Sequence, residues 1–267
     1  MGSIVRIDDR DDPRIAAYRD IRERDLVGRA GHFIAEGDVV VRVLLNASRY
    51  APVSLLLAEK RVAALEAEVA GLPDDVPVFV APQGILDAIA GFPMHRGILA
   101  LGRRAAFPPT DELLRALPKQ ALVLGLFGIA NHDNVGGIFR NAAAFGADLV
   151  LLDSDCCDPL YRKAIRVSAG NVLRVPFAQL GVGEDMVGRL AAHGFETFAL
   201  SPAGASLLAD APRPDRAALL FGAEGPGLPE SVLSRVKTIC IAMAPGVDSL
   251  NVATTSGIVL NHFSRMR

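Results

Sequence analysis

Short apolar runs alternate with amphipathic segments along the whole chain. In roughly the first 100 residues the apolar runs suit short buried strands, and between them apolar side chains recur at helical spacing. The expected strands are 33–35, 53–58, 76–81 and 97–101. The expected helices are 13–28, 38–47, 59–70 and 83–90. This alternation predicts a small α/β layer.

Residues 102–110 (GRRAAFPPT) lack periodicity and read as a linker. The alternation then resumes, and runs such as ALVLGLF and DLVLLD are typical of a parallel sheet covered on both faces. The expected strands are 121–127, 149–152, 172–177, 196–200, 217–221 and 238–242. The expected helices are 111–117, 135–145, 184–193 and 250–263. We therefore predict two α/β domains, 1–105 and 106–267.

The amino-acid composition excludes several classes of protein. Hydrophobic residues make up 51% of the 267 residues and charged residues 22%, which excludes a disordered chain and a coiled coil. No apolar run reaches the roughly 18 residues of a membrane span, and residues 1–12 lack the apolar core of a secretory signal. Three cysteines suit a reducing cytosol, and no Cys-x-x-Cys or His-x-x-x-His provides zinc ligands. We therefore expect a cytoplasmic protein with neither a membrane span nor a metal.

The charge is nearly balanced. The formal net charge is −2, with 14 Lys and Arg against 15 Asp and Glu on each side of residue 105. Because broad nucleic-acid binders are usually basic, any nucleic-acid site here must be a local patch. Arg outnumbers Lys 24 to 4, and Arg suits bidentate contacts with phosphate.

Three polar, glycine-containing segments each follow an expected strand of the second domain. The first begins at Asn131 (NHDNVGGIFRNA) and is expected to place Asn134 and Gly136 in a turn, with Arg140 in the first two turns of a helix. An ordinary turn with an exposed arginine would also fit. However, a loop that only connects two elements does not require four polar side chains and two glycines after an apolar strand, so this segment favours a functional loop.

The second segment (FGAEGPGL, 221–228) has the spacing Gly-x-x-Gly-x-Gly, which differs from the dinucleotide fingerprint. It holds Glu224 between glycines, and a tight turn is the alternative interpretation. The third segment leaves a strand through Pro-Gly, and Ser249 is expected to cap the last helix, with Asn251 in its first turn. Because all three segments follow strands, they should open on one edge of the sheet, where open α/β sheets bind ligands.

Together the motifs N-x-G-x-x-x-R, G-x-E-x-x-G and S-L-N-V resemble the SpoU (TrmH-like) branch of the SPOUT RNA methyltransferases. The resemblance covers about 121–263 and includes Ser168-Ala-Gly170. In the first half, Phe33 to Gly37 and His95 to Ala100 resemble landmarks of the L30e-like substrate domain of many members. Ala242 stands where the third motif usually has Pro, and Thr254-Thr255 replace smaller residues.

The resemblance implies a fold and an activity. The second domain would be a SPOUT domain with a parallel sheet and a deep trefoil knot, and the first would be a small L30e-like α/β domain that binds RNA. The activity would be methyl transfer from S-adenosylmethionine to a ribose 2′-hydroxyl of rRNA or tRNA. The working form would be a homodimer with the first and third motifs at its interface. We expect that a single sheet does not fully cover the apolar side chains of the last helix, which are Ile258, Val259, Leu260 and Phe263.

The resemblance also assigns roles to residues. Arg140 would stabilise the developing alkoxide or clamp a phosphate, because a guanidinium is effectively always charged. Asn134, Glu224, Ser249 and Asn251 would orient Arg140 and the ribose. The expected cofactor-binding residues are Leu200, Gly222, Gly225, Gly227, Ile241, Met243 and Leu250.

RNA contacts are expected from a basic cluster that flanks the Ser168-Ala-Gly170 turn. Its members are Arg162, Lys163, Arg166 and Arg174. A solvated surface is the alternative for this cluster. For the whole protein, the alternatives are a base-directed RNA methyltransferase, an inactive RNA-binding member of the family, and a nicotinamide oxidoreductase, for which the fingerprint is missing. The sequence does not identify the RNA or the nucleotide.

Overall fold

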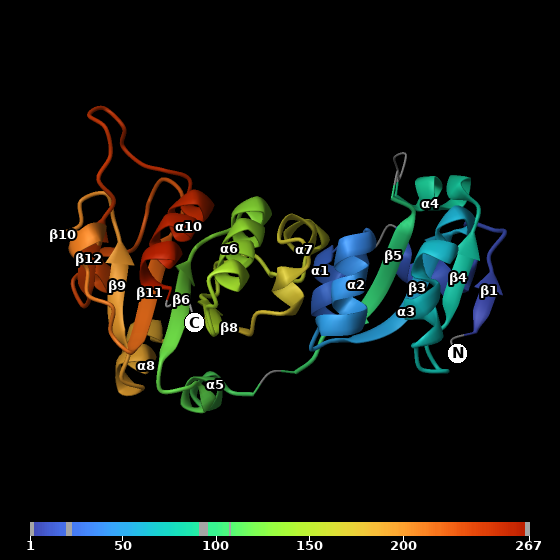
Figure 1. The fold of residues 1–267 in the computed structure, drawn as a ribbon, viewed down its shortest axis with the longest axis horizontal. Helices are drawn as coiled ribbons and strands as arrows, with labels where there is room; N and C mark the ends of the chain where they lie inside the picture. Colours follow the sequence, from blue (N-terminus) through green and yellow to red (C-terminus); the bar gives the residue numbers. More distant parts are fainter. Residues whose placement is uncertain (1–2, 20–22, 91–95, 107, 265–267) are drawn as a thin grey trace. The chain divides into compact units, whose positions relative to one another are not determined.

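Figure 1 shows the computed structural model, which describes residues 3–19, 23–90, 96–106 and 108–264. The chain divides into two compact units. The first unit is Met1–Ala106 together with Leu160–Arg174, and the second is Phe107–Pro159 together with Val175–Arg267. The chain therefore crosses from the first unit to the second near residue 106, inside the expected linker, and returns once to the first.

The first unit is built on a mixed sheet in the order β1-β4-β3-β5-β2. Its strands are β1 (Ile4–Arg6), β2 (His32–Glu36), β3 (Ala51–Ala58), β4 (Val78–Ala81) and β5 (Ile98–Arg103). β1, β4 and β3 run parallel, whereas β5 pairs antiparallel with β3 and β2. The apolar pattern does not predict β1, because this short edge strand stays largely exposed.

Helices and single turns cover this sheet. They are η1 (Pro13–Tyr18), α1 (Glu23–Gly28), α2 (Asp38–Ala47), η2 (Glu59–Arg61), η3 (Ala63–Leu65), α3 (Glu66–Ala70) and α4 (Gln83–Ala90). The bounds of α2 and α4 match the prediction at both ends. The helix expected over 13–28 is interrupted, since Arg19 has extended backbone, and residues 20–22 lie outside the described residues. His95, one of the proposed landmarks, also lies outside them.

The continuous helix expected over 59–70 is wrong for its first half. There the chain forms two 3-10 turns, and only residues 66–70 are α-helical. Arg42 Nη2 donates to the Ala64 carbonyl at 2.7 Å, which takes up an oxygen that a continuous helix would bond internally. The good helix propensity of this segment is therefore overridden by a tertiary contact.

The segment that returns to the first unit contains α7 (Arg162–Val167) and η4 (Asn171–Leu173). Ala169 and Gly170 follow α7 with positive φ values of 52° and 82°, so the chain turns sharply. A Cβ on Gly170 would lie 3.1 Å from Val43 Cβ, which shows how closely this turn packs on α2. The strand expected at 172–177 is therefore wrong: a buried 3-10 turn uses the same apolar residues.

The second unit is built on a fully parallel sheet in the order β10-β12-β9-β11-β6-β7-β8. Its strands are β6 (Ala121–Phe127), β7 (Leu149–Leu152), β8 (Phe177–Gln179), β9 (Glu196–Leu200), β10 (Ser206–Leu207), β11 (Arg216–Gly222) and β12 (Lys237–Cys240). The central strands β6 and β11 are almost wholly buried, which explains their continuous apolar runs.

The helices of the second unit are α5 (Thr110–Ala116), α6 (His132–Ala144), α8 (Met186–Ala192), the 3-10 turn η5 (Leu208–Asp210), α9 (Glu230–Leu233) and α10 (Val252–Phe263). α6 and α10 pack tightly against each other, since a Cβ on Gly137 would lie 2.7 Å from Ala253 Cβ. Asn141 Nδ2 also donates to the Ala253 carbonyl at 2.7 Å and to Ser256 Oγ at 2.9 Å. The start of α10 is thus fixed against α6.

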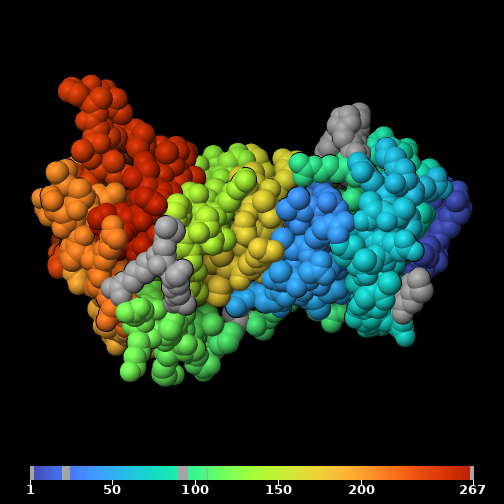
Figure 2. All heavy atoms as spheres, viewed as in Figure 1, coloured from blue at the N-terminus to red at the C-terminus, as the bar shows by residue number. Residues whose placement is uncertain are grey.

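β12 enters the sheet between β9 and β10, which precede it in the chain and are joined only by residues 201–205. The connecting loop bonds to the inserted strand: Ser201 N donates to the Ile239 carbonyl at 3.1 Å, and Ala205 N donates to Thr238 Oγ1 at 3.0 Å. Beyond β12, residues 244–250 are exposed and project from the second unit (Figure 2). Within the described ranges no helix combines the length and apolarity that crossing a membrane requires.

Candidate active site

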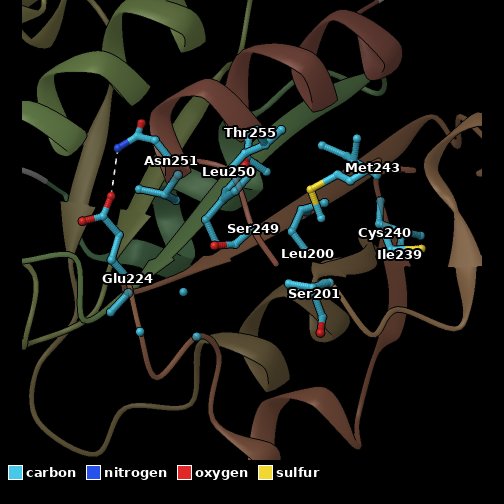
Figure 3. A pocket seen from close by; sticks show the side chains of 18 residues that line it. Leu200, Ser201, Glu224, Ile239, Cys240, Met243, Ser249, Leu250, Asn251 and Thr255 are labelled. Atoms are coloured by element: carbon cyan, nitrogen blue, oxygen red, sulfur yellow. Dashed lines mark hydrogen bonds between the residues drawn. The ribbon is translucent and has the colours of Figure 1, made fainter. Parts of the chain in front are cut away.

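A pocket of about 470 Å³ opens at the carboxyl edge of the seven-stranded sheet. Its walls are the ends of β9, β11 and β12 and the loop that leads into α10. Figure 3 shows Leu200, Met243 and Leu250 on one side and the polar side chains of Glu224 and Asn251 on the other. The pocket therefore lies where parallel α/β sheets bind ligands, as the positions of the motifs predict.

The segment after β11 forms a tight loop beside the pocket. Gly227 N donates to the Ala223 carbonyl at 3.0 Å, and Gly225 and Gly227 have positive φ values of 87° and 71°. A Cβ on Gly222 would lie 2.2 Å from the Gly227 carbonyl carbon, so a larger residue cannot fit without moving the backbone. The loop is thus closed by its glycines, and it holds Glu224 at the pocket wall.

Asn251 joins the three motifs. Its Nδ2 donates to Asn134 Oδ1 and to Glu224 Oε1, both at 2.8 Å, and Figure 3 shows the second bond. These two bonds use both hydrogens of the amide. One side chain from the third motif therefore fixes side chains from the first and the second.

Asn251 is also the N-cap of α10, because its Oδ1 accepts from Ala253 N at 3.0 Å and from Thr254 N at 3.2 Å. The prediction that Ser249 caps this helix, with Asn251 in its first turn, is therefore wrong. Ser249 instead lies in the exposed loop and lines the pocket.

The first motif lies in α6 rather than in a turn. Asn131 caps the helix by accepting from Asp133 N at 2.8 Å, so α6 begins three residues earlier than expected. Asn134 consequently lies in the first turn of the helix, where it is buried, and Gly136 follows it. Arg140 falls in the third turn, not in the first two.

Arg140 lies on the exposed side of α6 and is not one of the residues that line the pocket. Among the residues that the structure describes, none forms a hydrogen bond or ion pair with it. Its guanidinium is therefore available to an external group rather than committed to the fold.

All seven residues expected to bind a cofactor line this pocket, together with Glu224, Ser249 and Asn251. Asn134 reaches the pocket through Asn251, and Arg140 does not reach it within its own chain. Eight lining residues were not predicted from the sequence: Ser201, Pro202, Phe221, Ala223, Ile239, Cys240, Val252 and Thr255. The positions of strand ends could have indicated the first six of these, because they lie at or next to the carboxyl ends of β9, β11 and β12.

The three cysteines differ in environment. Burial raises the pKa of the Cys157 thiol to about 12 and raises the pKa of Cys156 further, with the negative charges of Asp158 and Asp153 adding to it. Both thiols are therefore protonated at neutral pH and poorly nucleophilic. Cys240 instead lines the pocket, and its Sγ lies 3.5 Å from the Ser206 carbonyl.

The basic cluster belongs to the first unit. Arg162 Nε bonds to Oε2 of the buried Glu36 at 2.9 Å, so this charge holds α7 against β2. Lys163, Arg166 and Arg174 are exposed. With this segment included, the first unit has 18 Lys and Arg against 15 Asp and Glu, whereas the second has 10 against 15.

The chain resembles known methyltransferases. The model of the SpoU rRNA Methylase family matches residues 121–261. An uncharacterized tRNA/rRNA methyltransferase of Mycobacterium bovis is 38% identical and covers 96% of this chain and 90% of its own length.

Two solved structures share the fold over nearly the full length. The rRNA methyltransferase from Sinorhizobium meliloti, crystallised with AdoMet bound, has a TM-score of 0.83 at 22% identity and covers 98% of each chain. An RNA 2′-O ribose methyltransferase has a TM-score of 0.79 at 23% identity and covers 97% of this chain and 98% of its own.

Proposed function

The chain belongs to the SpoU rRNA methylase family, and from this premise we propose that it transfers a methyl group to a ribose 2′-hydroxyl of rRNA or tRNA in the cytoplasm. It is an RNA methyltransferase, and S-adenosylmethionine is its cofactor. The observation that carries the proposal is the Asn134–Asn251–Glu224 network beside a pocket lined by all seven expected cofactor residues.

The pocket fits the cofactor in size and chemistry. Its volume of about 470 Å³ lies within the range of small-molecule sites, roughly 300–1,000 Å³. The apolar side chains of Leu200, Met243 and Leu250 suit an adenine ring, and Gly222 lets the backbone approach a ligand closely. When bound, the cofactor supplies a methyl group activated by its sulfonium.

Backbone groups are the proposed holders of the adenine and ribose. They belong to Leu200, Gly222, Ile241, Met243 and Leu250, and Gly225 and Gly227 shape the loop beside them. Such contacts need no side-chain charge, and none of these residues is fully buried.

Arg140 is the proposed catalytic cation. Methylation forms an O–C bond as the S–C bond of the sulfonium breaks, and the hydroxyl proton passes to water, so negative charge develops on the ribose oxygen. A guanidinium stabilises that charge or clamps the adjacent phosphate, and it is a poor base because it stays protonated. Asn134, Glu224, Ser249 and Asn251 would orient the ribose and Arg140.

Ribose rather than base is favoured by the 2′-O ribose methyltransferase among the structures that share this fold. Comparison of the nucleosides of rRNA and tRNA from cells with and without the protein tests this directly. We expect one 2′-O-methylated nucleotide to disappear with the protein. Loss of a base-methylated nucleotide, with every ribose methylation kept, would contradict the proposal and favour base-directed chemistry.

We also propose that the second unit carries the trefoil knot of SPOUT enzymes. The supporting feature is β12, which enters the sheet between β9 and β10 beneath the short connection that joins them. Simple α/β folds avoid such threading. The residues of this crossing also line the pocket, so the knot and the cofactor site would be one structure.

The protein is proposed to work as a homodimer through α6, α10 and the loop before α10. Of the apolar residues expected to be uncovered on the last helix, Val259, Leu260 and Phe263 are buried in the chain itself. Ile258 is 39% exposed, and Leu250 and Val247 are 39% and 48% exposed. Ile258 and Val247 are the apolar side chains that a second copy would cover, whereas Leu250 lines the cofactor pocket.

Light scattering at micromolar concentration should give twice the chain mass of 28.2 kDa. Because Arg140 does not line the pocket of its own chain, we place it against the pocket of the second copy. A fully active monomer would contradict both parts of this proposal.

RNA selection is assigned to the first unit, which we propose to be the L30e-like domain. Its excess of positive charge comes from the returning segment, whose exposed Lys163, Arg166 and Arg174 are the proposed phosphate contacts. Arg162 is engaged with Glu36 and would act by holding this segment in place. Deletion of residues 1–105 would expose the buried Ile165 and Leu173 of the returning segment. Point variants are therefore a better test of its RNA contacts.

Cysteine alkylation should report cofactor binding. Iodoacetamide at pH 8 should modify Cys240 well before Cys156 and Cys157, whose thiols stay protonated. S-adenosylhomocysteine should then protect Cys240, because this side chain lines the pocket. Peptide mass spectrometry measures each site, and equal labelling of Cys240 with and without the ligand would place the cofactor elsewhere.

A further inference from the structure

The first unit contains a pocket of its own, with a volume of about 350 Å³. Three arginines line it together with the first turn of α2 and Ile98. The lining charged residues are Asp38, Arg42, Arg61 and Arg96. Three guanidinium groups and one carboxylate line the pocket, and Glu68 pairs with Arg42 beside it, so positive charge still exceeds negative charge by one.

Arg96 lies directly over the start of α2. Gly37 is the N-cap residue of this helix, with φ at 90° and no side-chain cap. A Cβ on Gly37 would lie 2.8 Å from both Cδ and Nη1 of Arg96, so glycine is what lets the guanidinium approach. Arg96 is exposed and has no hydrogen-bond or ion-pair partner among the described residues.

Arg42 is held in place on the other side of the pocket. It donates to Asp38 Oδ1 at 3.0 Å and to the Ala64 carbonyl at 2.7 Å, and it also pairs with Glu68. Asp38 and Glu68 therefore both contact Arg42. Arg96 lines the cavity together with Asp38 and Val39, the first residues of α2, a helix of ten residues whose start has no side-chain cap.

We propose that this pocket binds a phosphate group, and that in the working enzyme the group is a backbone phosphate of the RNA. The assignment of RNA rests on the proposed function, whereas the phosphate site rests on the pocket alone. Arginine offers a planar pair of donors that matches phosphate oxygens, and helix-start amides and the helix dipole favour an anion. The site would anchor the RNA without reading its bases.

The test uses the full chain with Arg96→Gln, and Arg115→Gln as a variant of equal charge change on the exposed side of α5. Fluorescence anisotropy with a labelled RNA stem-loop is measured at about 50 to 200 mM KCl. Arg96→Gln should weaken binding about three- to tenfold and lower the slope of log affinity against log salt by about 0.7 to 0.9, the value of one phosphate contact. Arg115→Gln should keep the slope.

Thermal melting in inorganic phosphate, against chloride at equal ionic strength, separates the two sources of phosphate. Phosphate should stabilise the wild type and not Arg96→Gln. If Arg96→Gln loses the stabilisation by phosphate but keeps the salt dependence of RNA affinity, the pocket binds free phosphate and the assignment of an RNA phosphate is overturned. If neither measurement responds to Arg96→Gln, the pocket proposal is wrong. A wild type that transfers no methyl group, with phosphate stabilisation still lost in Arg96→Gln, would overturn the proposed function alone.

Discussion

Replacing Arg140 with alanine should lower the rate of methyl transfer by a factor on the order of 10²–10³, the usual effect of removing one group that stabilises a developing oxyanion. The affinity for S-adenosylmethionine should stay nearly unchanged, because Arg140 is outside the pocket of its own chain and its proposed partner at the second copy is the ribose oxygen or its phosphate. Single-turnover rates with saturating RNA and isothermal titration of the cofactor measure the two effects separately.

Arg140→Lys is the matched control, since it keeps the charge and loses the planar pair of donors. Its rate should lie between those of the wild type and Arg140→Ala. The thermal midpoint of both variants should equal that of the wild type, because the exposed side chain has no partner among the described residues. A normal rate in Arg140→Ala would remove this residue from the catalytic machinery.

Replacing Gly222 with alanine should weaken cofactor binding by about a hundredfold or more, because the new Cβ cannot be accommodated without a shift of the backbone. It would meet the carbonyl carbon of Gly227 at 2.2 Å and Leu228 N at 2.4 Å, both backbone atoms of the loop at the pocket. Isothermal titration measures the loss. Gly84→Ala serves as the control, since nothing lies within 4 Å of a Cβ there. Cofactor affinity equal to that of the wild type in Gly222→Ala would mean that this loop does not hold the cofactor.

Mixing these two inactive variants tests whether Arg140 acts on the pocket of the second copy. A heterodimer of Arg140→Ala and Gly222→Ala would contain one site with an intact pocket and an intact arginine. Random exchange in a twofold dimer should restore about a quarter of the wild-type activity. If each Arg140 serves its own chain, the mixture stays inactive.

The expected cofactor residues came from the family resemblance, but the edge of the sheet where they lie was predictable from the ends of the strands. Apolar runs locate β6, β9 and β11 within a residue, and in a parallel sheet their carboxyl ends share one edge. Whatever follows those strands is then brought together, whether or not its role is known. Leu200 and Gly222 are the last residues of β9 and β11, and both line the pocket.

The N-cap of α10 could not be predicted from the sequence in the same way. Ser249 and Asn251 are both favoured caps, and propensity alone does not separate them. The tertiary bonds of Asn251 to Asn134 and Glu224 fix its side chain at the place where its oxygen also caps the helix. A contact across 117 positions of the chain therefore decides a local feature.

The returning segment 160–174 shows a second limit of prediction from sequence, which concerns the boundaries of the two units. A change in composition marks the linker near residue 106, but no such change marks the return of the chain to the first unit. The pairing of Arg162 with Glu36 joins residues 126 positions apart, and either residue alone resembles an ordinary surface charge. The sequence therefore predicts Arg162 as an RNA contact without showing that its guanidinium also pairs with Glu36.

The central claim is that the methyl group reaches a ribose oxygen. The most direct measurement incubates the purified protein with S-adenosylmethionine carrying a deuterated methyl group and with unmodified rRNA and tRNA transcripts, followed by digestion and mass spectrometry of the nucleosides. We expect the heavy methyl group to leave with the ribose fragment of a single nucleoside, and Arg140→Ala to form this product at a rate lower by a factor on the order of 10²–10³. A heavy methyl group retained on the base fragment would contradict the central claim.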